Sequence, residues 1–290
     1  MIGLVTVTFD SEPVLPDFLD SVRHLETPVR VYAVDNDSTD ASLELLERAN
    51  DLDLVVLAQS ENLGIAVGNN IGIRRALRDG CDWIVLINND TEFEPDLVAR
   101  LLAAAEAADA LVVVPSIRFH EHPEQVWFEA ARYANWRGSV PVALPPAEPG
   151  SITPIECACT CCALVHKSVF EEIGLMDEAY FVYWDDTDFF LRSWRAGIPM
   201  VLDAGATMLH KVSTLTGGGE SEFSQRQRIK NRTYFVRKHS RRLRRSIALL
   251  LTLANLIKLT ASGAGRRRRA TVLWRAFRDG LRMPVTPPID

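Results

Sequence analysis

Continuous apolar runs recur along the first 120 residues and alternate with segments of helical periodicity. The runs lie at residues 2–9, 29–36, 52–59, 83–89 and 110–117. The helical segments between them lie at 37–50, 64–80 and 94–109. Apolar runs without polar alternation are typical of strands that are covered on both faces. Strands that alternate with helices in this way predict an α/β fold, with a mostly parallel sheet flanked by helices.

The pattern changes in the second half of the chain. Residues 120–155 contain six prolines and two tryptophans with little periodicity, which indicates an insertion or a flap over an active site. Strand and helix signals return at 161–174, where a strand precedes a short helix, and at 180–197, where an acid cluster opens a helix. Residues 198–210 predict a strand pair or a strand and a loop, and helical character begins near residue 222.

These changes divide the sequence into a body and a tail. We expect one α/β domain over residues 1–240, with halves at 1–118 and 119–240, followed by a basic helical tail at 241–290. Residues 225–290 contain 18 Lys and Arg but two acids, whereas the rest of the chain contains 14 basic and 36 acidic residues. The net charge of −6 therefore hides an acidic body and a basic tail. The tail is expected to bind a polyanion or an anionic membrane surface.

Cysteine use indicates a reducing compartment. The chain has five cysteines, an odd number, and four of them fall within residues 157–162, which does not suit a secreted disulfide framework. Cys157, Cys159 and Cys161 alternate, so on a strand they would share one face as small buried hydrophobes. A zinc role is not expected because no second pair of ligands follows at the required spacing. No basic segment precedes the first apolar run, so we expect no signal peptide and a cytoplasmic location.

Polar side chains follow three of the strand signals. Asp35 ends the second run, Asn62 follows the third, and residues 88–91 (Asn-Asn-Asp-Thr) end the fourth. In open α/β sheets, ligands bind outside the carboxyl ends of the strands. These side chains are therefore expected to meet at one edge of the sheet and to form a binding site there.

Three motifs leave two interpretations open on the residues alone. Gly64, Gly68 and Gly72 recur every four residues, which permits either close packing of a helix on a sheet or approach of the backbone to a phosphate or sugar. They do not form a dinucleotide fingerprint, and the chain contains no phosphate-loop motif. The acids within 185–188 either match a helix dipole or supply a general base of raised pKa. His210, at the end of a strand signal, is either structural or a metal ligand.

In this order and spacing, the motifs resemble those of inverting glycosyltransferases of family 2 with the GT-A fold, most of all the rhamnosyltransferase-like branch. The resemblance covers about residues 2–240, with 1–118 as the nucleotide-binding half and 119–240 as the acceptor half. It rests on VTVTFD (5–10), VDNDSTDAS (34–42), NLGIAVGNNIG (62–72), LINNDT (86–91), YWDDTDFFLR (183–192) and HKVS (210–213).

The resemblance implies a divalent metal site. The segment 88–90 lies where the family carries its D-x-D motif, so Asp90 and His210 are expected to bind Mn²⁺ or Mg²⁺. Asn88 is expected near the donor ribose or the metal-bound water. Such a metal neutralises the leaving diphosphate as a Lewis acid. The first acid of the family motif is Asn88 here, which leaves one charge fewer for the metal.

The resemblance also implies roles in donor binding and catalysis. Asp35 is expected to accept the N3–H of a pyrimidine base, with the backbone at Thr8 beside that base. Asp186 is expected to be the general base that deprotonates the acceptor hydroxyl. The other residues expected at the donor are Asn62, Gly64, Asn69, Asn89, Arg228, Asn231 and Arg232, and those expected on the acceptor side are Trp184, Asp185 and Asp188.

We therefore predict a metal-dependent inverting glycosyltransferase that acts in cell-envelope polysaccharide synthesis. The expected donor is a nucleoside-diphosphate sugar, with dTDP-rhamnose first and UDP- or GDP-sugars next. The expected acceptor is a glycan or a polyprenyl-diphosphate-linked glycan. The alternatives are a catalytically inactive, membrane-associated sugar-binding scaffold and a nucleotidyltransferase. The latter would need a lysine-rich triphosphate loop near the N-terminus, and residues 5–16 contain no lysine.

The basic tail predicts contact with a membrane surface. Its apolar run at 246–257 has 12 residues, whereas a membrane-spanning helix needs about 20. Residues 271–283 place apolar side chains near one helical face and arginines elsewhere, which is typical of helices in an anionic interface. We expect peripheral association with the inner face of the cell membrane; a homodimer contact or a cover for the sheet is the alternative. Nucleic acid is not expected because no recognition motif is present. The glycine-rich segment 215–220 predicts a mobile lid.

Overall fold

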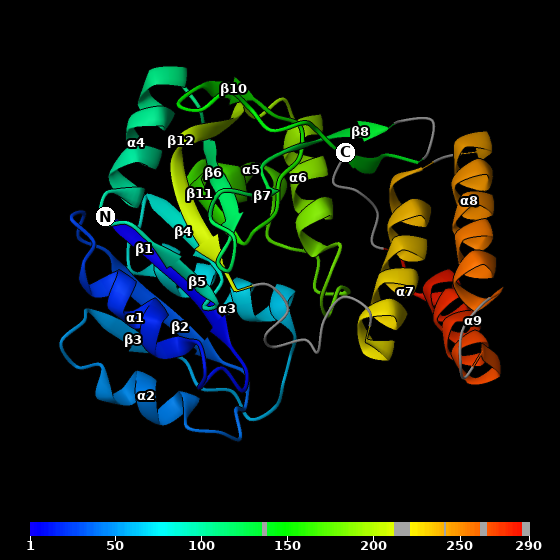
Figure 1. The fold of residues 1–290 in the computed structure, drawn as a ribbon, viewed down its shortest axis with the longest axis horizontal. Coiled ribbons are helices and arrows are strands. Elements are labelled where there is room, and N and C mark those ends of the chain that lie inside the picture. The colour runs from blue at the N-terminus through cyan, green and yellow to red at the C-terminus, as the bar shows by residue number, and fades with distance from the viewer. Residues whose placement is uncertain (135–137, 212–220, 241, 262–265, 286–290) are drawn as a thin grey trace.

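The structure is a computed structural model that describes residues 1–134, 138–211, 221–240, 242–261 and 266–285. A mixed sheet crosses the body in the order β10-β12-β6-β11-β4-β1-β2-β3 (Figure 1). Its strands are β1 (Ile2–Thr8), β2 (Arg30–Asp35), β3 (Leu54–Val56), β4 (Trp83–Ile87), β6 (Val112–Phe119), β10 (Ile152–Pro154), β11 (Cys162–His166) and β12 (Met200–His210), with β5 (Thr91–Phe93) paired to β12 and β7 (Val126–Phe128) paired to β6. A separate two-stranded sheet joins β8 (Ala131–Ala134) to β9 (Val140–Ala143).

Helices α1 (Leu15–Arg23), α2 (Ser42–Arg48), α3 (Ile65–Arg78), α4 (Leu97–Ala108), α5 (Lys167–Ile173) and α6 (Asp185–Arg195) cover the two faces of the main sheet. The chain continues into α7 (Glu222–His239), α8 (Arg242–Ala261) and α9 (Arg266–Arg282). Side chains of α1, α2 and α4 pack in the core on one face, and those of α3, α5 and α6 pack in the core on the other. The predicted α/β class, with a sheet between helical layers, is confirmed.

Parallel pairing brings the polar ends of three strands to one edge of the sheet. β1 pairs in parallel with β2 and with β4, so that Thr8 lies opposite Asp35. The antiparallel strand β11 separates this group from β6 and β12, which again run parallel to each other. Asp35 and the segment that follows Ile87 therefore reach the same edge, as the sequence predicted.

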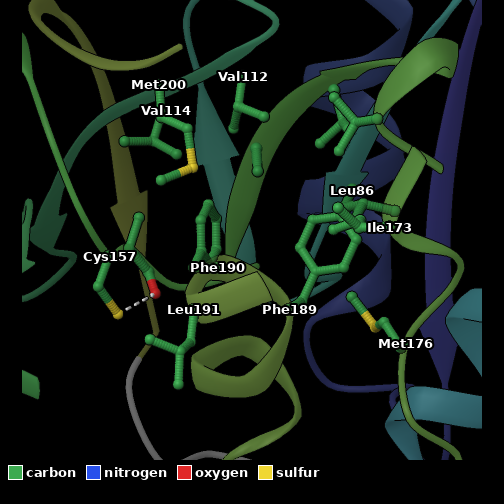
Figure 2. Close-up of a cluster of buried hydrophobic side chains, with 14 of the residues drawn as sticks. Leu86, Val112, Val114, Cys157, Ile173, Met176, Phe189, Phe190, Leu191 and Met200 are labelled. Atoms are coloured by element: carbon green, nitrogen blue, oxygen red, sulfur yellow. Dashed lines mark hydrogen bonds between the residues drawn. The ribbon is translucent and has the colours of Figure 1, made fainter. Parts of the chain in front are cut away.

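Helix α6 is held on the sheet by aromatic side chains. Figure 2 shows Phe189 and Phe190 of α6 in the cluster that also contains Val114 of β6 and Met200 of β12. Both rings are fully buried. Burying a side chain of this size stabilises a fold by about 1.5–3 kcal/mol, so the helix that carries the acid cluster is firmly attached to the core.

Several elements differ from the sequence predictions. The sequence analysis assigned nothing to residues 10–28, which contain α1; its buried face, with Leu15, Phe18 and Val22, repeats at helical spacing. Within residues 198–210, one long strand, β12 (Met200–His210), forms with a register shift. Residues 120–155 contain short strands among irregular segments. The strand expected through Cys157, Cys159 and Cys161 is wrong: β11 begins at Cys162, and Cys157 and Cys161 pack on opposite faces of the sheet.

The tail packs on α7. Helices α7 and α9 make the larger contact, and α8 contacts both (Figure 1). Ala248 of α8 and Met283 after α9 pack against the core of the body. Among the described residues, no helix combines the length and the apolar character needed to cross a bilayer. The predicted lid at 215–220 lies outside the described residues.

Candidate active site

Asp35 is fixed at the edge of the sheet by neutral hydroxyl groups. Its carboxylate is almost fully buried at the end of β2. The Oγ1 of Thr8 donates to Oδ1 at 2.9 Å, and the Oγ of Ser38 donates to the same oxygen at 2.6 Å. The backbone N–H of Ser38 donates to Oδ2 at 3.1 Å. The structure thus places both Thr8 and Asp35 at the predicted donor edge, with the Thr8 side chain bonded to the acid.

Asn89 ties the end of β4 to β1. Its Nδ2 donates to the carbonyl of Val7 at 3.1 Å and to the Oγ of Ser11 at 2.9 Å. The amide nitrogen predicted to contact the donor is therefore used within the protein. The neighbouring Asn88 is partly buried, and its backbone N–H donates to the carbonyl of Cys161 at 2.9 Å. Asn88 thus remains the amide of this pair that can face a ligand.

Asp90 and His210 meet from distant parts of the chain. Asp90 follows β4, and His210 ends β12, where it lies opposite Thr91 in the β5–β12 pairing. The Nε2 of His210 lies 3.3 Å from the Oδ2 of Asp90, and the ring of Trp127 packs edge-on at 4.4 Å from the imidazole. Both residues are more than nine-tenths buried. The predicted metal pair is thus brought together by the sheet, although its members are 120 residues apart.

The chemistry of this pair fits a divalent cation. Asp90 Oδ1 and His210 Nδ1 are buried and have no hydrogen-bond partner among the described residues. Unpartnered buried polar atoms are costly and call for a ligand, an ion or water. The described residues contain no group of three or more His, Cys, Asp or Glu that could hold a metal alone. An ion held here by Asp90 and His210 would complete its shell with oxygen atoms from water or a phosphorylated ligand.

Three acids open helix α6, and they occupy two different environments. Asp185 is buried, and this burial together with the charge of Asp186 raises the pKa of Asp185 to about 8. Burial also raises the pKa of Asp186, although hydrogen bonds from Thr187 oppose the shift. Those bonds, from the backbone N–H at 2.6 Å and from Oγ1 at 3.2 Å, both go to Oδ1 of Asp186. Asp186 is partly exposed and its Oδ2 accepts no hydrogen bond from the described residues.

Asp188 lies in a different place from the one predicted. It has no exposed surface and accepts from His239 Nε2 at 2.5 Å, Lys238 Nζ at 2.8 Å and Arg192 Nε at 2.8 Å. Burial alone would raise its pKa, but the bond from His239 and the charges of Lys238 and Arg192 hold the pKa of Asp188 well below its usual range. Because these groups enclose the carboxylate, Asp188 is part of the interior, and this geometry gives no support to its predicted contact with an acceptor.

The glycine-containing helix α3 favours the packing interpretation. A Cβ on Gly72 would lie 2.4 Å from Val5 Cγ1, so the glycine allows the helix to sit close to β1. Gly64 has a φ of 82°, and a Cβ there would lie 2.4 Å from the carbonyl oxygen of Phe181. Asn62 Oδ1 accepts from the Gly64 N–H at 3.0 Å. These contacts account for the motif without a phosphate.

Asn69 and two arginines predicted at the donor are distributed over two helices. Asn69 on α3 is buried, and its Nδ2 faces the sulfur of Met176 at 3.7 Å, away from the strand ends. The guanidinium of Arg228 on α7 lies 4.7 Å from the centre of the Tyr183 ring, next to the entry of α6. Arg232, one turn later on α7, is partly buried.

The cysteine segment 157–162 lies near both Asp90 and Asp186. Burial, the neighbouring Cys159 and the charge of Asp90 raise the pKa of Cys161. Burial raises the pKa of Cys157, and the charge of Asp186 adds to that shift. Electrostatic effects of this kind fall off with distance, so this one segment lies near both acidic groups. All five cysteines are free thiols.

Three residues near the candidate sites were not predicted from the sequence. Trp127 contacts His210, and Lys238 and His239 of α7 contact Asp188 of the acid helix. Asn231 of α7, which was expected at the donor, donates instead to the backbone carbonyls of Val182 and Tyr183. Trp127, Lys238 and His239 fall in no recognisable motif. The one usable signal was that a buried carboxylate needs partners, and that requirement does not say where along the chain the partners lie.

Comparison with solved structures defines the class of fold. The chain is similar to the mannosyltransferase PcManGT from Pyrobaculum calidifontis, solved with GDP-Man and Mn²⁺, at a TM-score of 0.60 and 16% identity, covering 97% of this chain and 87% of that one. It is also similar to S. aureus TarS in complex with UDP-GlcNAc, at a TM-score of 0.61 and 12% identity, covering 96% of this chain and 81% of that one. The fold is therefore that of the GT-A glycosyltransferases, as predicted.

The family follows from the sequence comparisons. The model of glycosyl transferase family 2 matches residues 4–174, more than half of the chain, and the chain belongs to this family. It is 28% identical over 242 residues to the N-acetylglucosaminyl-diphospho-decaprenol L-rhamnosyltransferase of Mycobacterium tuberculosis, covering 75% of this chain and 78% of that protein. It is 25% identical over 209 residues to the low-salt glycan biosynthesis hexosyltransferase Agl10 of Haloferax volcanii, covering 68% of this chain but only 62% of that protein. The family inferred from the motifs is confirmed.

Proposed function

We propose that this chain transfers a sugar, with inversion, from a nucleoside-diphosphate sugar to a hydroxyl group of a lipid-linked glycan. The observation that carries the proposal is the buried Asp90–His210 pair, whose two unpartnered atoms lie beside the ends of β4 and β12. A divalent ion held by this pair would neutralise the leaving diphosphate as a Lewis acid. Mn²⁺ and Mg²⁺ both suit such ligands, and the mannosyltransferase with a similar fold was solved with Mn²⁺.

Asp186 is the proposed general base. An attacking hydroxyl must lose its proton, and a carboxylate within hydrogen-bond reach is a suitable acceptor. Asp186 keeps Oδ1 bonded to Thr187, which leaves Oδ2 to receive the proton. Burial raises the pKa of both Asp185 and Asp186 above the ordinary range of a carboxyl group, which suits a group that receives a proton. A single displacement with this base behind the acceptor oxygen inverts the anomeric centre.

A rhamnosyl donor is the first choice. Two similar proteins are named as rhamnosyl transferases, one for N-acetylglucosaminyl-diphospho-decaprenol and one using dTDP-rhamnose. Asp35 at the donor edge would accept the N3–H that thymine and uracil share. Others of similar sequence are galactofuranosyltransferases, so the sugar itself needs a direct test.

Turnover with a donor panel tests this proposal. The purified protein would be supplied with Mn²⁺, a polyprenyl-diphosphate N-acetylglucosamine acceptor, and dTDP-rhamnose, UDP-galactofuranose or GDP-mannose in turn. We expect product with dTDP-rhamnose, loss of product in EDTA, and loss of product in Asp186→Asn. Product that persists in EDTA would overturn the metal role, and product only with GDP-mannose would overturn the choice of a rhamnosyl donor.

We also propose that α8 and α9 rest on the inner face of the cell membrane, where a lipid-linked acceptor is found. Leu243, Leu250 and Ile257 recur every seven residues on α8 and are 73%, 63% and 53% exposed. On α9, Trp274 is exposed beside a basic face of arginines. Exposed apolar and aromatic side chains next to arginines are typical of helices bound at an anionic interface.

Flotation with vesicles tests the membrane contact. We expect the protein to float with vesicles that contain phosphatidylglycerol and not with pure phosphatidylcholine. A triple substitution of Arg275, Arg278 and Arg282 to Gln should weaken flotation, because each arginine near an anionic surface contributes about 1 kcal/mol. Absence of flotation at physiological salt, together with a dimer in light scattering, would reassign the face to a homodimer contact.

A further inference from the structure

The backbone that leads into the acid helix is in an unusual conformation. Tyr183 and Trp184, directly before α6, have φ values of 65° and 74°, in the left-handed region that residues with a Cβ seldom adopt. Such a conformation costs free energy and persists only where the surroundings hold it. Two such residues in succession, immediately before the candidate base Asp186, therefore need a structural cause.

Helix α7 holds the residues that precede Asp186. The Nδ2 of Asn231 donates to the carbonyl of Val182 at 2.8 Å and to that of Tyr183 at 3.0 Å. Asn231 has no exposed surface, so these bonds form away from competing water. The Phe235 ring packs 5.1 Å from the Trp184 ring. The two consecutive carbonyls and the aromatic ring fix the path of the backbone just before the acids.

The same helix also holds Asp188, which follows Asp186, through an ion pair and a hydrogen bond. Lys238 and His239, at the end of α7, both donate to Asp188 Oδ1. Lys238 also pairs with Asp177 at 2.7 Å, and an NH1 of Arg195 lies 3.2 Å from His239 Nδ1. Because arginine is only a donor, Nδ1 of His239 must accept, which leaves the proton of the neutral ring on Nε2, facing Asp188.

We propose that α7 is the positioning element of the catalytic base, with Asn231 and His239 as positioning residues that fix the backbone on both sides of Asp186. Asn231 holds the residues before the base, and His239 holds the residue two positions after it. The inference rests on the proposed function only in taking Asp186 as the base. Neither residue contacts the donor edge, so loss of either should lower the rate of transfer and leave nucleotide binding intact.

A matched pair of substitutions at His239 tests this role. His239→Gln keeps a nitrogen donor at nearly the position of Nε2, whereas His239→Met has a similar length and no donor. We expect His239→Met to lower kcat by about tenfold or more, because small misplacement of a reacting group is costly. We expect His239→Gln to retain most of the rate. The dissociation constant for dTDP with Mn²⁺, measured by calorimetry, should stay within about twofold of the unsubstituted protein in both variants, since the donor edge is not disturbed.

A control on the same helix separates positioning from general destabilisation. Thr233 of α7 is buried and donates only within the helix, to the carbonyl of Ile229, so Thr233→Val disturbs α7 without touching the segment before α6. Thr233→Val should keep kcat even if its melting temperature falls. If His239→Met does not fold, Asn231→Ser provides the same test from the other side. Equal rates in the Gln and Met variants would overturn the inference, as would a loss of dTDP binding that parallels the loss of rate. An absence of turnover by the unsubstituted protein with every donor would instead overturn the proposed function.

Discussion

Asp35 at the donor edge and Asp188 in the acid helix are both buried carboxylates, and each is held in place by a different kind of hydrogen-bond donor. At the donor edge, Asp35 is held by the neutral hydroxyl groups of Thr8 and Ser38, which lie within the strands and turns that precede and follow it. At the acid helix, Asp188 is held by Lys238 and His239, about 50 residues later in the chain and fully enclosed. Neutral local donors tolerate solvent and salt, whereas buried charge pairs are strong only while every partner is in place. We therefore expect substitutions at the two sites to affect different properties, namely nucleotide binding at the donor edge and the rate of transfer at the acid helix.

The largest effect should come from Asp186→Asn. An amide cannot accept the proton of the hydroxyl group, and general base catalysis typically contributes about 10²- to 10⁴-fold to a rate. Initial rates of sugar transfer should fall by that factor while calorimetric binding of dTDP with Mn²⁺ is unchanged. The exposed Asp37→Asn, in the other half of the chain, serves as the control and should be neutral. Loss of nucleotide binding in Asp186→Asn would move this residue to the donor site.

Asp90→Asn should break the donor edge instead. Removing the charged oxygen next to His210 weakens the binding of a hard divalent cation. The increase in dTDP affinity on addition of Mn²⁺ should therefore fall by about tenfold or more. Calorimetry with and without Mn²⁺ measures this difference. Glu92→Gln is a matched control, because Glu92 lies two residues away and pairs with Lys211 and His120. If Mn²⁺ enhances nucleotide binding equally in Asp90→Asn, the metal lies elsewhere.

Gly64→Ala tests the point where the two regions touch. A Cβ at Gly64 would lie 2.4 Å from the Phe181 carbonyl oxygen, whereas a Cβ at Gly80, which has a similar positive φ, would meet nothing within 4 Å. Both variants carry backbone strain, but only Gly64→Ala adds overpacking, which typically costs about 1–3 kcal/mol. Urea unfolding should therefore show a larger loss of stability for Gly64→Ala than for Gly80→Ala. Equal losses of stability in the two variants would mean that the backbone near Phe181 shifts to accommodate the added Cβ at little cost.

A further prediction concerns the pH dependence of stability. The pKa of Asp185 is raised from its ordinary value to about 8, so the folded state binds a proton that the unfolded state releases between about pH 4 and pH 8. The unfolding free energy should fall as pH rises through this window, by at most about 1.4 kcal/mol per pH unit for this group. Asp185→Asn should flatten that slope in urea unfolding at pH 5, 6, 7 and 8, whereas Asp37→Asn should not. A slope that steepens in Asp185→Asn would contradict the protonated state assigned to Asp185.

The comparison also explains how far the sequence could be interpreted. The donor edge was predictable because strand ends in a parallel sheet converge, so Asp35 and Asp90 could be placed together from local patterns. The Asp90–His210 pair needed the family resemblance, since β12 returns to the site only through the sheet order. The enclosure of Asp188 and the hydrogen bonds from Asn231 to the backbone before α6 could not be predicted. Both depend on the packing of α7, whose residues show no motif and no strong amphipathic pattern.

Three residues of the family motifs make contacts within the protein. Asn89, Gly64 and Asn69 were expected at the donor from their motif positions, and in the structure their side chains or backbone contact other parts of the chain. A family motif records all the positions that a site needs, including those that only support it. Separating supporting positions from ligand-binding positions requires the hydrogen-bond partners, and those partners are set by tertiary structure.

The buried cluster around Asp188 also restricts how this enzyme can vary. Two carboxylates, Asp177 and Asp188, are set against the cations Lys238 and Arg192, so the charges in the enclosed space balance. Replacing any one of them leaves an uncompensated charge in the interior, which is strongly destabilising. Changes at these positions should therefore be tolerated only in compensating combinations. New acceptor specificity is more readily selected at exposed positions, while the four positions of the cluster change together or not at all.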